Sequence, residues 1–541
     1  MRVTPIRRVR IRGALDAIPQ IACPVGMPVH CRLSVAFILG ALASFGPSAA
    51  RGEVRLASVF SDNAVLQRGR PIPVWGWCEA GETVTVEFRG HRVRTTSANG
   101  RWVVRLPRQD AGGPDSLTVR GHSQTTTLTN ILVGEVWVCS GQSNMEWPLG
   151  RSENSKADID ASANPRIRLF TVPKLKADAP VDDVKSHWEL CNPESVPGFS
   201  AVAYYFGAAL EKARQVPIGL IHTSWGGSPA EVWMRPDVLA GDPDFKRSII
   251  DGFAQRLPAF EASLVAWEKE AADLKAQGKK PAKQKPSIGW KPSELYHGMI
   301  TPIVPYAIAG AIWYQGESNA GRAQEYSRLF PAMIRNWRRD WDQGSFPFLA
   351  VQLAPWDKGR KRSPEQITAA PGDSDWAELR EAQLLATKVL PRVGMAVITD
   401  VGDKDDIHPV KKKPVGERLA LAARAIAYRE RIVASGPEFV RMSVSRSQAR
   451  LTFTHVGKGL EAHGGALTGF QICGSDRGWV WADARIEGRH VIVSSPKVPK
   501  PIAVRYGWSD FPVVNLFNID GLPATPFRSD NFPMITAPKK P

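Results

Sequence analysis

One segment of the sequence places a serine where its hydroxyl could act as a nucleophile. In VWVCSGQSNMEW, Ser143 follows an apolar run and Gly141 and precedes a predicted helix start. A serine in such a strand-to-helix turn can expose its Oγ atom while its own N–H points at a developing oxyanion. The other interpretation is a serine that caps the helix N-terminus. Asn144, the next residue, is a candidate for binding the substrate or orienting a neighbouring group.

Two further polar clusters follow apolar runs. In LIHTSWGGSPAEVW, Gly226 and Gly227 leave the backbone open to close approach by a ligand, so their N–H groups are candidate oxyanion donors. In AIWYQGESN, the amide of Gln315 could donate to an oxyanion, and Glu317 could orient a neighbour or the substrate. The alternatives are an ordinary turn at the glycines and a solvated turn at Gln315 and Glu317.

A histidine that could serve as a base lies near the end of the same region. In TDVGDKDDIHPV, His408 follows Asp405 and Asp406 by three and two residues. A carboxylate this close can fix the tautomer of the imidazole while the imidazole takes a proton from the serine. The other interpretation is a structural or merely exposed loop histidine. His222 and His297, which also lie near predicted strand ends, are reserve candidates.

The elements that must position these residues alternate between strand and helix. From about residue 133 to residue 430, short apolar runs alternate with helical segments such as EYSRLFPAMIRNWRRDW. This order predicts an α/β domain with a parallel sheet, helices on both faces and ligands at the carboxyl ends of the strands. Residues 242–291 are a predicted insertion, a helical stretch followed by a Lys- and Pro-rich loop. No repeat with a period of 20 to 50 residues is visible.

Two β-rich domains are predicted to flank the α/β domain. Residues 51–132 and 431–541 contain short alternating runs separated by turn residues, for example ETVTVEF and SQARLTFTHV. Residues 1–50 have the order of a secretory signal, with an apolar stretch at 33–46 that is shorter than the ~20 residues needed to span a bilayer. We expect cleavage after Ala50 and export to the periplasm or the medium, with Met27 as an alternative start. A short uncleaved anchor is the other interpretation.

The composition excludes several classes of protein. A chain of 541 residues with 43% hydrophobic residues can form a sizeable core and exceeds the roughly 250 to 300 residues of a single core. The net charge of +17 could favour anionic partners, but the lysine clusters at 279–285 and 411–413 are interpreted as solvated surface. No nucleic-acid-binding module accompanies this charge, so we expect no nucleic-acid partner. The six cysteines and ten histidines show no metal-ligand spacing.

Four of these segments, taken together and in this order, resemble the sialate O-acetylesterase family, carbohydrate esterases of the SGNH hydrolase superfamily: GQSNMEWPL, SWGGSPAEVW, WYQGESNA and DDIHP. The resemblance extends over about residues 53–535. It implies an SGNH-like three-layer α/β/α domain and a serine hydrolase that removes acetyl groups from sugars with no metal or organic cofactor. The implied roles are Ser143 as nucleophile, His408 as base and acid, and the N–H of Ser143, a glycine N–H and Gln315 as oxyanion donors.

The group that orients the histidine stays open at this stage. The superfamily's usual spacing selects Asp405, whereas relatives in this family often read DIH, which favours Asp406. A third alternative is a working Ser–His pair oriented by a backbone carbonyl or by Glu317. The sequence also departs from the superfamily's GDSL motif, since Gln142 stands where that motif has an aspartate.

The expected substrate is an acetylated sugar, with the 9-O-acetyl ester of sialic acid first. Arg235 or Arg322 could supply a basic pocket for the sialate carboxylate. An esterase acting on acetylated xylan or another plant polysaccharide is the alternative, because the motifs indicate acyl transfer and not the sugar. A glycan-binding protein without catalysis is the alternative of another class. We expect no stable membrane insertion after signal cleavage, and the sequence leaves the oligomeric state open.

Overall fold

The computed structural model describes residues 53–538. The predicted signal peptide, its cleavage point after Ala50 and the alternative start at Met27 lie outside these residues. Among the helices of residues 53–538, none is both long and apolar enough to cross a membrane. The four cysteines of the same range are buried and unpaired, and they are Cys78, Cys139, Cys191 and Cys473.

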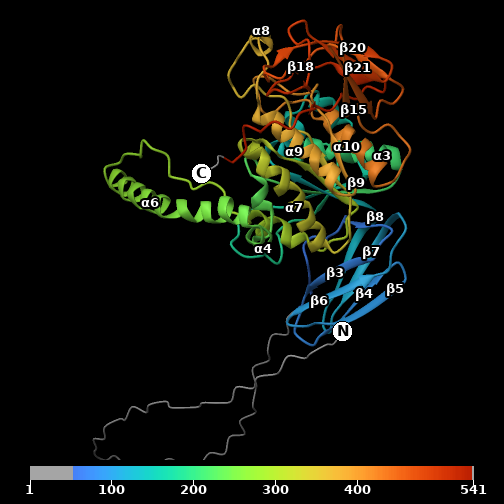
Figure 1. The fold of residues 1–541 in the computed structure, drawn as a ribbon. Helices are drawn as coiled ribbons and strands as arrows, with labels where there is room; N and C mark the ends of the chain where they lie inside the picture. Colours follow the sequence, from blue (N-terminus) through green and yellow to red (C-terminus); the bar gives the residue numbers. More distant parts are fainter. Residues whose placement is uncertain (1–52, 539–541) are drawn as a thin grey trace, which may run out of the picture. The chain divides into compact units, whose positions relative to one another are not determined.

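A sheet of parallel strands forms the centre of the α/β region (Figure 1). The strand order is β10-β9-β11-β8-β12-β13-β14, and every neighbouring pair is parallel except β10 and β9. The strands are β8 (Thr125–Gly141), β9 (Asn164–Thr171), β10 (Trp188–Cys191), β11 (Ile218–Ser224), β12 (Gly310–Tyr314), β13 (Phe348–Val351) and β14 (Val393–Ala396). The predicted α/β fold class is therefore confirmed, with one antiparallel strand at the edge of the sheet.

Helices cover both faces of this sheet because its strands are apolar on both sides. Along β8, Val136 and Val138 belong to one hydrophobic core, and Trp137 and Cys139 belong to the other. This alternation is the period of two residues that a strand imposes on its side chains. Helices α7 (Ala323–Trp341) and α9 (Asp375–Val389) contribute to the first core, whereas α3 (Ala201–Arg214) and α10 (Lys413–Ile426) contribute to the second.

The other helices are short, apart from α6. They are α1 (Ser143–Glu146), α2 (Ser155–Asp160), α4 (Pro236–Gly241), α5 (Pro243–Phe245), α6 (Gly252–Ala276) and α8 (Pro364–Thr368). The 3-10 and π turns are η1 (Leu149–Arg151), η2 (Val196–Gly198), η3 (Ala230–Trp233), η4 (Lys246–Asp251), η5 (Tyr296–Ile300), η6 (Thr301–Ile303) and η7 (Glu317–Arg322).

The N-terminal strands are continuous with the central sheet through β8. The amino-terminal part of β8 pairs with β7 in antiparallel fashion, and its carboxyl-terminal part pairs with β11 and β12. The predicted boundary between residues 132 and 133 thus falls inside one strand. The strands before β8 are β1 (Arg55–Leu56), β2 (Val65–Gln67), β3 (Ile72–Trp77), β4 (Thr83–Phe88), β5 (His91–Thr96), β6 (Arg101–Leu106) and β7 (Gly112–Arg120).

The C-terminal strands form antiparallel sheets over a core of their own. They are β15 (Glu438–Ser445), β16 (Gln448–Thr454), β17 (Leu460–Ala462), β18 (Phe470–Cys473), β19 (Val480–Trp481), β20 (Asp483–Glu487), β21 (His490–Ser494), β22 (Ala503–Tyr506), β23 (Leu516–Asn518) and β24 (Phe527–Arg528). β-rich sheets thus flank the central sheet in the sequence, while the exact domain limits stay a prediction.

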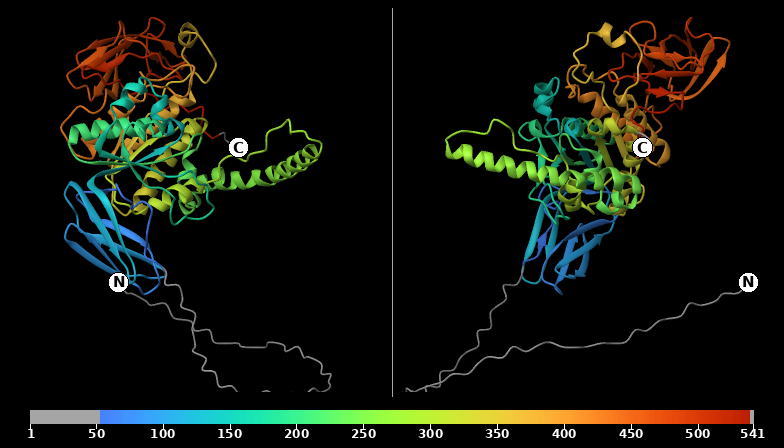
Figure 2. Two further views of the ribbon diagram at one scale, coloured as in Figure 1. Left: turned by 180° about the vertical axis from the view of Figure 1, so that it is seen from behind. Right: turned by 60° about the vertical axis from the view of Figure 1, so that its left-hand side comes forward.

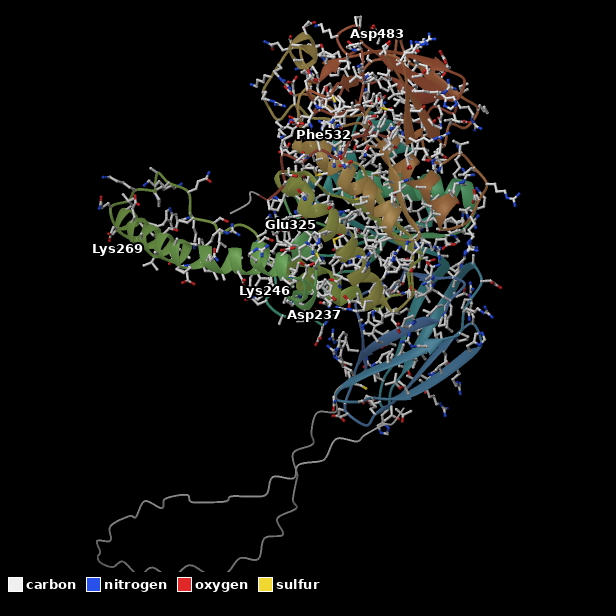
Figure 3. All side chains as sticks on the ribbon, in the orientation of Figure 1. Asp237, Lys246, Lys269, Glu325, Asp483 and Phe532 are labelled. Carbon is white, nitrogen blue, oxygen red and sulfur yellow. The ribbon has the colours of Figure 1, made fainter. Side chains whose placement is uncertain are left out.

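The predicted insertion at 242–291 contains α5, η4 and the long helix α6. Helix α6 extends away from the central sheet in both views of Figure 2, and Figure 3 shows Lys269 on its outer part. Phe253, near the start of α6, is its one buried side chain. The base of this insertion is therefore packed against the α/β region, and the rest of the helix is exposed.

Gly141, the last residue of β8, provides a test of how tightly the central strands approach each other. A Cβ atom at this position would lie 2.1 Å from the carbonyl oxygen of Tyr314, and the glycine has a φ of 139°. We expect Gly141→Ala to lower the Tm by about 5 °C or more, because backbone atoms must move apart. Gly241→Ala, which adds a methyl group to open space, is the matched control for thermal melting. Equal melting of the two variants would contradict this description of the sheet.

Candidate active site

Three neighbouring strands bring the predicted site residues to one edge of the sheet. Gly141 at the end of β8 is paired with Ser224 of β11 on one side and Tyr314 of β12 on the other. The residues that follow each strand therefore emerge at the same level. This register explains how Ser143, the two glycines and Glu317 lie close together despite long separations in the sequence.

Ser143 and His408 are joined by a hydrogen bond. The Nε2 atom of His408 lies 2.8 Å from the Oγ atom of Ser143. The imidazole stacks on the indole of Trp147 with ring centres 5.4 Å apart and planes at 20°. Burial lowers the pKa of His408, an effect that the nearby carboxylate of Asp406 opposes. The imidazole is thus held in place and in the neutral form that can accept a proton.

The structure places Asp406, and not Asp405, beside the histidine. Asp406 Oδ1 lies 3.5 Å from His408 Nδ1 and accepts a hydrogen bond of 2.8 Å from the backbone N–H of His408. The carboxylate of Asp405 instead pairs with Lys404. Because Asp406 is 55% exposed, its interaction with the imidazole is weakened by solvent.

The glycine loop reaches the serine, although one of its N–H groups is already engaged. A Cβ atom on Gly226 would lie 3.2 Å from the Cβ of Ser143, so this glycine permits close contact with the turn. The N–H of Gly226 donates to Glu146 Oε2 at 2.6 Å, and Glu146 also pairs with Lys174. Gly227 has a φ of 74°, a conformation that favours glycine. Ser143 opens α1, so its N–H has no acceptor within that helix.

The amide of Gln315, which was predicted to donate to the oxyanion, is engaged within the protein. It is fully buried, and its Nε2 atom donates to the carbonyl oxygen of Ser228 at 3.3 Å and to Asn319 Oδ1 at 2.6 Å. Its Oε1 atom accepts from the hydroxyl of Tyr326 at 2.9 Å. Both amide hydrogens are donated within the protein, so this arrangement argues against Gln315 as an oxyanion donor. The side chain supports the loop after β12 and the loop after β11 instead.

Asn144 and Glu317 form a buried network with a residue that sequence reasoning missed, Lys412. Asn144 Nδ2 donates to Glu317 Oε1 at 2.6 Å, and Asn144 Oδ1 accepts from the ammonium of Lys412. Burial raises the pKa of Glu317 and lowers the pKa of Lys412 to about 7. The prediction of a solvated lysine cluster is wrong for Lys412, because this side chain turns inward from the start of α10 and is 1% exposed.

The remaining predicted residues do not join the Ser143–His408 pair. His222 is buried on β11, where its Nε2 atom lies 2.6 Å from Ser224 Oγ and burial lowers its pKa to about 4. His297 lies in η5 and contacts the carbonyl oxygen of Ala177. Within residues 53–538, no group of three or more His, Cys, Asp or Glu side chains could hold a metal ion.

Both predicted arginines already have carboxylate partners. Arg235 pairs with Asp237 and Asp340, and Arg322 pairs with Glu231 and Glu325. These ion pairs neutralise the two guanidinium groups that were predicted to bind a sialate carboxylate.

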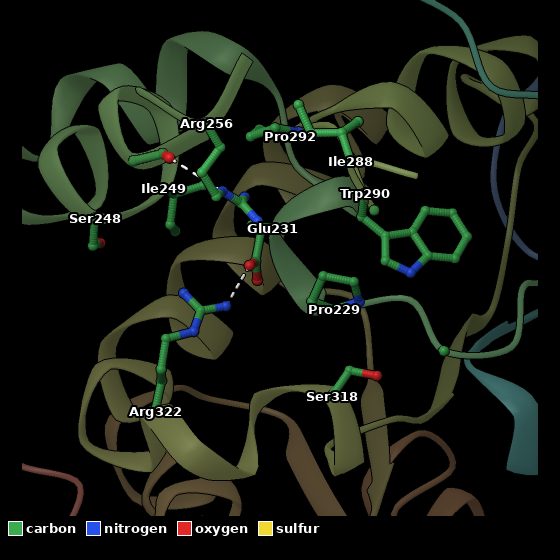
Figure 4. A pocket seen from close by; sticks show the side chains of 13 residues that line it. Pro229, Glu231, Ser248, Ile249, Arg256, Ile288, Trp290, Pro292, Ser318 and Arg322 are labelled. Atoms are coloured by element: carbon green, nitrogen blue, oxygen red, sulfur yellow. Dashed lines mark hydrogen bonds and ion pairs between the residues drawn. The ribbon is translucent and has the colours of Figure 1, made fainter. Parts of the chain in front are cut away.

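A cavity of about 420 Å³ adjoins the glycine loop. Gly227 and Ser318 are among its lining residues, and Figure 4 shows Arg322 joined to Glu231 with Trp290 across the view. More than half of the lining residues come from the insertion at 242–291, among them Arg256 and Trp290. Trp290 Nε1 lies 4.0 Å from the position that a Cβ of Gly227 would occupy. The insertion therefore builds one wall of the cavity beside Gly227.

Comparison with known proteins agrees with this fold. A family described as "Carbohydrate esterase, sialic acid-specific acetylesterase" matches residues 133–257 and 280–424. The chain is 29% identical to rat sialate O-acetylesterase over 505 residues, which cover 85% of this chain and 90% of that protein. It is 29% identical to the human sialate O-acetylesterase over 501 residues, which cover 85% of this chain and 88% of that protein.

A solved structure is also similar over its whole length. The carbohydrate acetylesterase XAC1771 from Xanthomonas citri is 38% identical, with a TM-score of 0.76, and the match covers 89% of this chain and 100% of that one. The chain belongs to the sialic acid-specific acetylesterase family of carbohydrate esterases. This confirms the family predicted from the motifs and an ester hydrolase activity, and it sets aside the glycan-binding alternative without catalysis.

The two neighbouring aspartates allow a matched test of which carboxylate acts on His408. We expect Asp406→Asn to lower kcat/KM by about tenfold or more, because the imidazole loses its orienting anion. Asp405→Asn should change kcat/KM by less than about twofold, since Asp405 faces Lys404. Steady-state kinetics of both variants on one acetyl ester decide the point. The reverse order of effects would assign the role to Asp405.

Proposed function

We propose that this protein removes O-acetyl groups from sugars with Ser143 as the nucleophile and His408 as the general base and acid. The observation that carries the proposal is the 2.8 Å contact between Ser143 Oγ and His408 Nε2 at the carboxyl edge of the sheet. A serine becomes a competent nucleophile when a positioned base takes its proton.

The proposed reaction has two steps. In the first, Ser143 Oγ attacks the acetyl carbonyl carbon while His408 takes the hydroxyl proton, and the sugar oxygen leaves with that proton. In the second, water attacks the acetyl-enzyme with His408 again as base, and acetate leaves. Each step passes through an oxyanion that backbone N–H groups would stabilise.

The N–H groups of Ser143, Gly226 and Gly227 are the proposed donors to that oxyanion. In this structure the N–H of Gly226 donates to the carboxylate of Glu146. We propose that this carboxylate moves away from the N–H of Gly226 when the carbonyl oxygen of the substrate binds there. Lys174 holds the other oxygen of the same carboxylate and could keep Glu146 paired in its new place.

The 9-O-acetyl ester of sialic acid is the first proposed substrate. The family description and the names of the rat and human relatives support it. The cavity next to the glycine loop supports it as well, because Arg256 lines it and has no carboxylate partner within residues 53–538. An unpaired guanidinium can bind a sugar carboxylate, and the indole of Trp290 can contact a sugar ring.

An acetylated plant polysaccharide is the second proposed substrate. The observation that favours it is that Arg322, which lines the cavity, is paired with Glu231 and Glu325, so that Arg256 is the one lining guanidinium without a carboxylate partner in the described residues. The similar solved structure is described as a carbohydrate acetylesterase, without mention of sialic acid.

Residues 1–50 keep their proposed role as an export signal. Their order of charged, apolar and small residues supports cleavage after Ala50 and action in the periplasm or the medium. N-terminal sequencing of the exported protein checks this, since it should begin at Arg51.

Acetate release by the wild type and Ser143→Ala tests the proposed function. We expect the wild type to release acetate and Ser143→Ala to lose at least about 1,000-fold in kcat, because the acetyl-enzyme cannot form. O-acetylated sialic acid and acetylated xylan, measured side by side, decide between the two substrates. Turnover by Ser143→Ala at the wild-type rate would refute the proposed nucleophile.

The pH dependence of kcat/KM tests the proposed base. The protonated imidazole cannot accept the serine proton, so activity should fall as the pH drops through the pKa of His408. Because burial lowers this pKa, the midpoint of the fall should lie below the usual value of about 6.5. A rate on a rapidly cleaved ester that stays constant from about pH 4 to pH 9 would exclude His408 as the base.

A further inference from the structure

The ammonium group of Lys412 is buried beneath the active site without a carboxylate in contact. The side chain is 1% exposed, and among the ion pairs of residues 53–538 none joins Nζ of Lys412 to a carboxylate. Its polar contact is Asn144 Oδ1. Nζ also lies 5.6 Å from the ring centre of Trp147 and 5.4 Å from that of Tyr314. Burying a cation without a carboxylate in contact costs free energy of folding. The position of Lys412 against Asn144 therefore points to a functional role.

Asn144 connects the two chain segments that carry the reacting groups. Its Nδ2 atom donates to Glu317 Oε1 at 2.6 Å and to the carbonyl oxygen of Ile407 at 3.0 Å. Asn144 follows the nucleophile directly, and Ile407 precedes the base directly. The hydrogen bond between Asn144 and Ile407 therefore ties the turn of Ser143 to the loop of His408, in addition to the direct contact between the two side chains.

Three partners set the orientation of the Asn144 amide. Glu317 and Ile407 accept from its NH2 group, and the ammonium of Lys412 donates to its Oδ1 atom, because an ammonium can only donate a hydrogen bond. Without the ammonium, the buried Oδ1 atom loses its donor and the amide is held from one side alone.

We propose that Lys412 is a positioning residue of the esterase reaction, which locks the Asn144 amide in the orientation that ties the His408 loop to the Ser143 turn. This inference rests on the proposed function, since it needs Ser143 and His408 to be the reacting pair. Lys412 touches neither the serine nor the imidazole in this structure and acts through Asn144.

The same ammonium also affects the protonation of the base. The charged groups that face His408 are Asp406 on its own loop, Arg151 on η1 and Lys412 at the start of α10, and Glu317 on η7 is connected through Asn144. Lys412 and Arg151 lower the pKa of His408, whereas Asp406 raises it. Burial lowers the pKa of Lys412 to about 7, so the ammonium form is present on the acid side, where His408 titrates.

The test compares Lys412→Met with Lys411→Met, a neighbouring exposed lysine, in the full chain. We expect Lys412→Met to lose about tenfold or more in kcat with little change in KM, because the reacting pair is misaligned. The acid limb of its kcat/KM profile should move to higher pH by about half a unit, because a cation that opposes protonation of His408 is gone. Lys411→Met should match the wild type in both measurements.

A second variant keeps the test decisive if Lys412→Met folds poorly. Removing the lysine alone leaves the buried carboxylate of Glu317 without a nearby cation. The double variant Lys412→Met and Glu317→Gln also removes that carboxylate charge. We expect this double variant to melt closer to the wild type and still to have a low kcat, since Asn144 keeps no donor that fixes its orientation.

Two results would overturn the inference. One is a folded Lys412→Met enzyme, or a folded double variant, with wild-type kcat and an unmoved acid limb. The other is a loss of activity that thermal melting accounts for entirely, with no shift of the acid limb in the molecules that remain folded. Failure of the proposed function is recognised separately, as undiminished turnover by Ser143→Ala measured alongside, and that result overturns both.

Discussion

The register of three parallel strands is the constraint on which the site depends. Gly141 lies opposite Tyr314 so closely that any side chain at this glycine would collide with the neighbouring carbonyl group. Because β8 and β12 are this close and β11 ends at the same level, the loops that follow them meet at one edge of the sheet. Ser143, the glycine loop and the buried carboxylate of Glu317 share that edge for this reason.

Hydrogen bonds between loops, and not the strands alone, bring the imidazole of His408 to the hydroxyl of Ser143. His408 comes from a loop before α10, far from Ser143 in the sequence, and the Asn144 amide joins the two segments. Trp147 supports the imidazole from one side. A ring held by stacking and by its Nε2 contact loses little freedom when the reaction begins, and such preorganisation is a general source of rate enhancement.

Much of this arrangement was predictable from the sequence, because apolar runs that end in polar clusters are a direct sign of strand ends in an α/β sheet. Ser143, Gly226 and His408 could be found in this way. The choice between Asp405 and Asp406 could not be made from the sequence, since both are near the histidine in the chain. The fold of the loop decides it, because Asp405 pairs with Lys404 and Asp406 lies beside His408.

The errors concern the directions of individual side chains. Gln315 stands at a strand end, as predicted, but its amide donates its hydrogens to Ser228 and Asn319. Lys412 looks like part of an exposed basic cluster, and its burial follows from the tertiary position of the start of α10. One feature of the sequence could have indicated that Lys412 lies near the site: it follows His408 by four residues, at the predicted start of a helix.

The insertion at 242–291 shows how one chain can modify a shared fold. The family match omits residues 258–279, which lie within α6 and the turn that follows it. The parts of the insertion on either side nevertheless line the cavity beside Gly227. We therefore propose that the chemistry resides at the sheet edge, whereas the insertion contributes to the choice of sugar through the residues that line the cavity.

The most direct test of the central claim is to trap the covalent intermediate. Rapid acid quenching during turnover of an acetyl ester, followed by peptide mass spectrometry, shows which residue carries the acetyl group. The account predicts one acetyl group on the peptide that contains Ser143, and its absence when His408 is replaced by Asn. An acetyl group on another residue during turnover, or rapid acetylation of Ser143 without the imidazole, would contradict it.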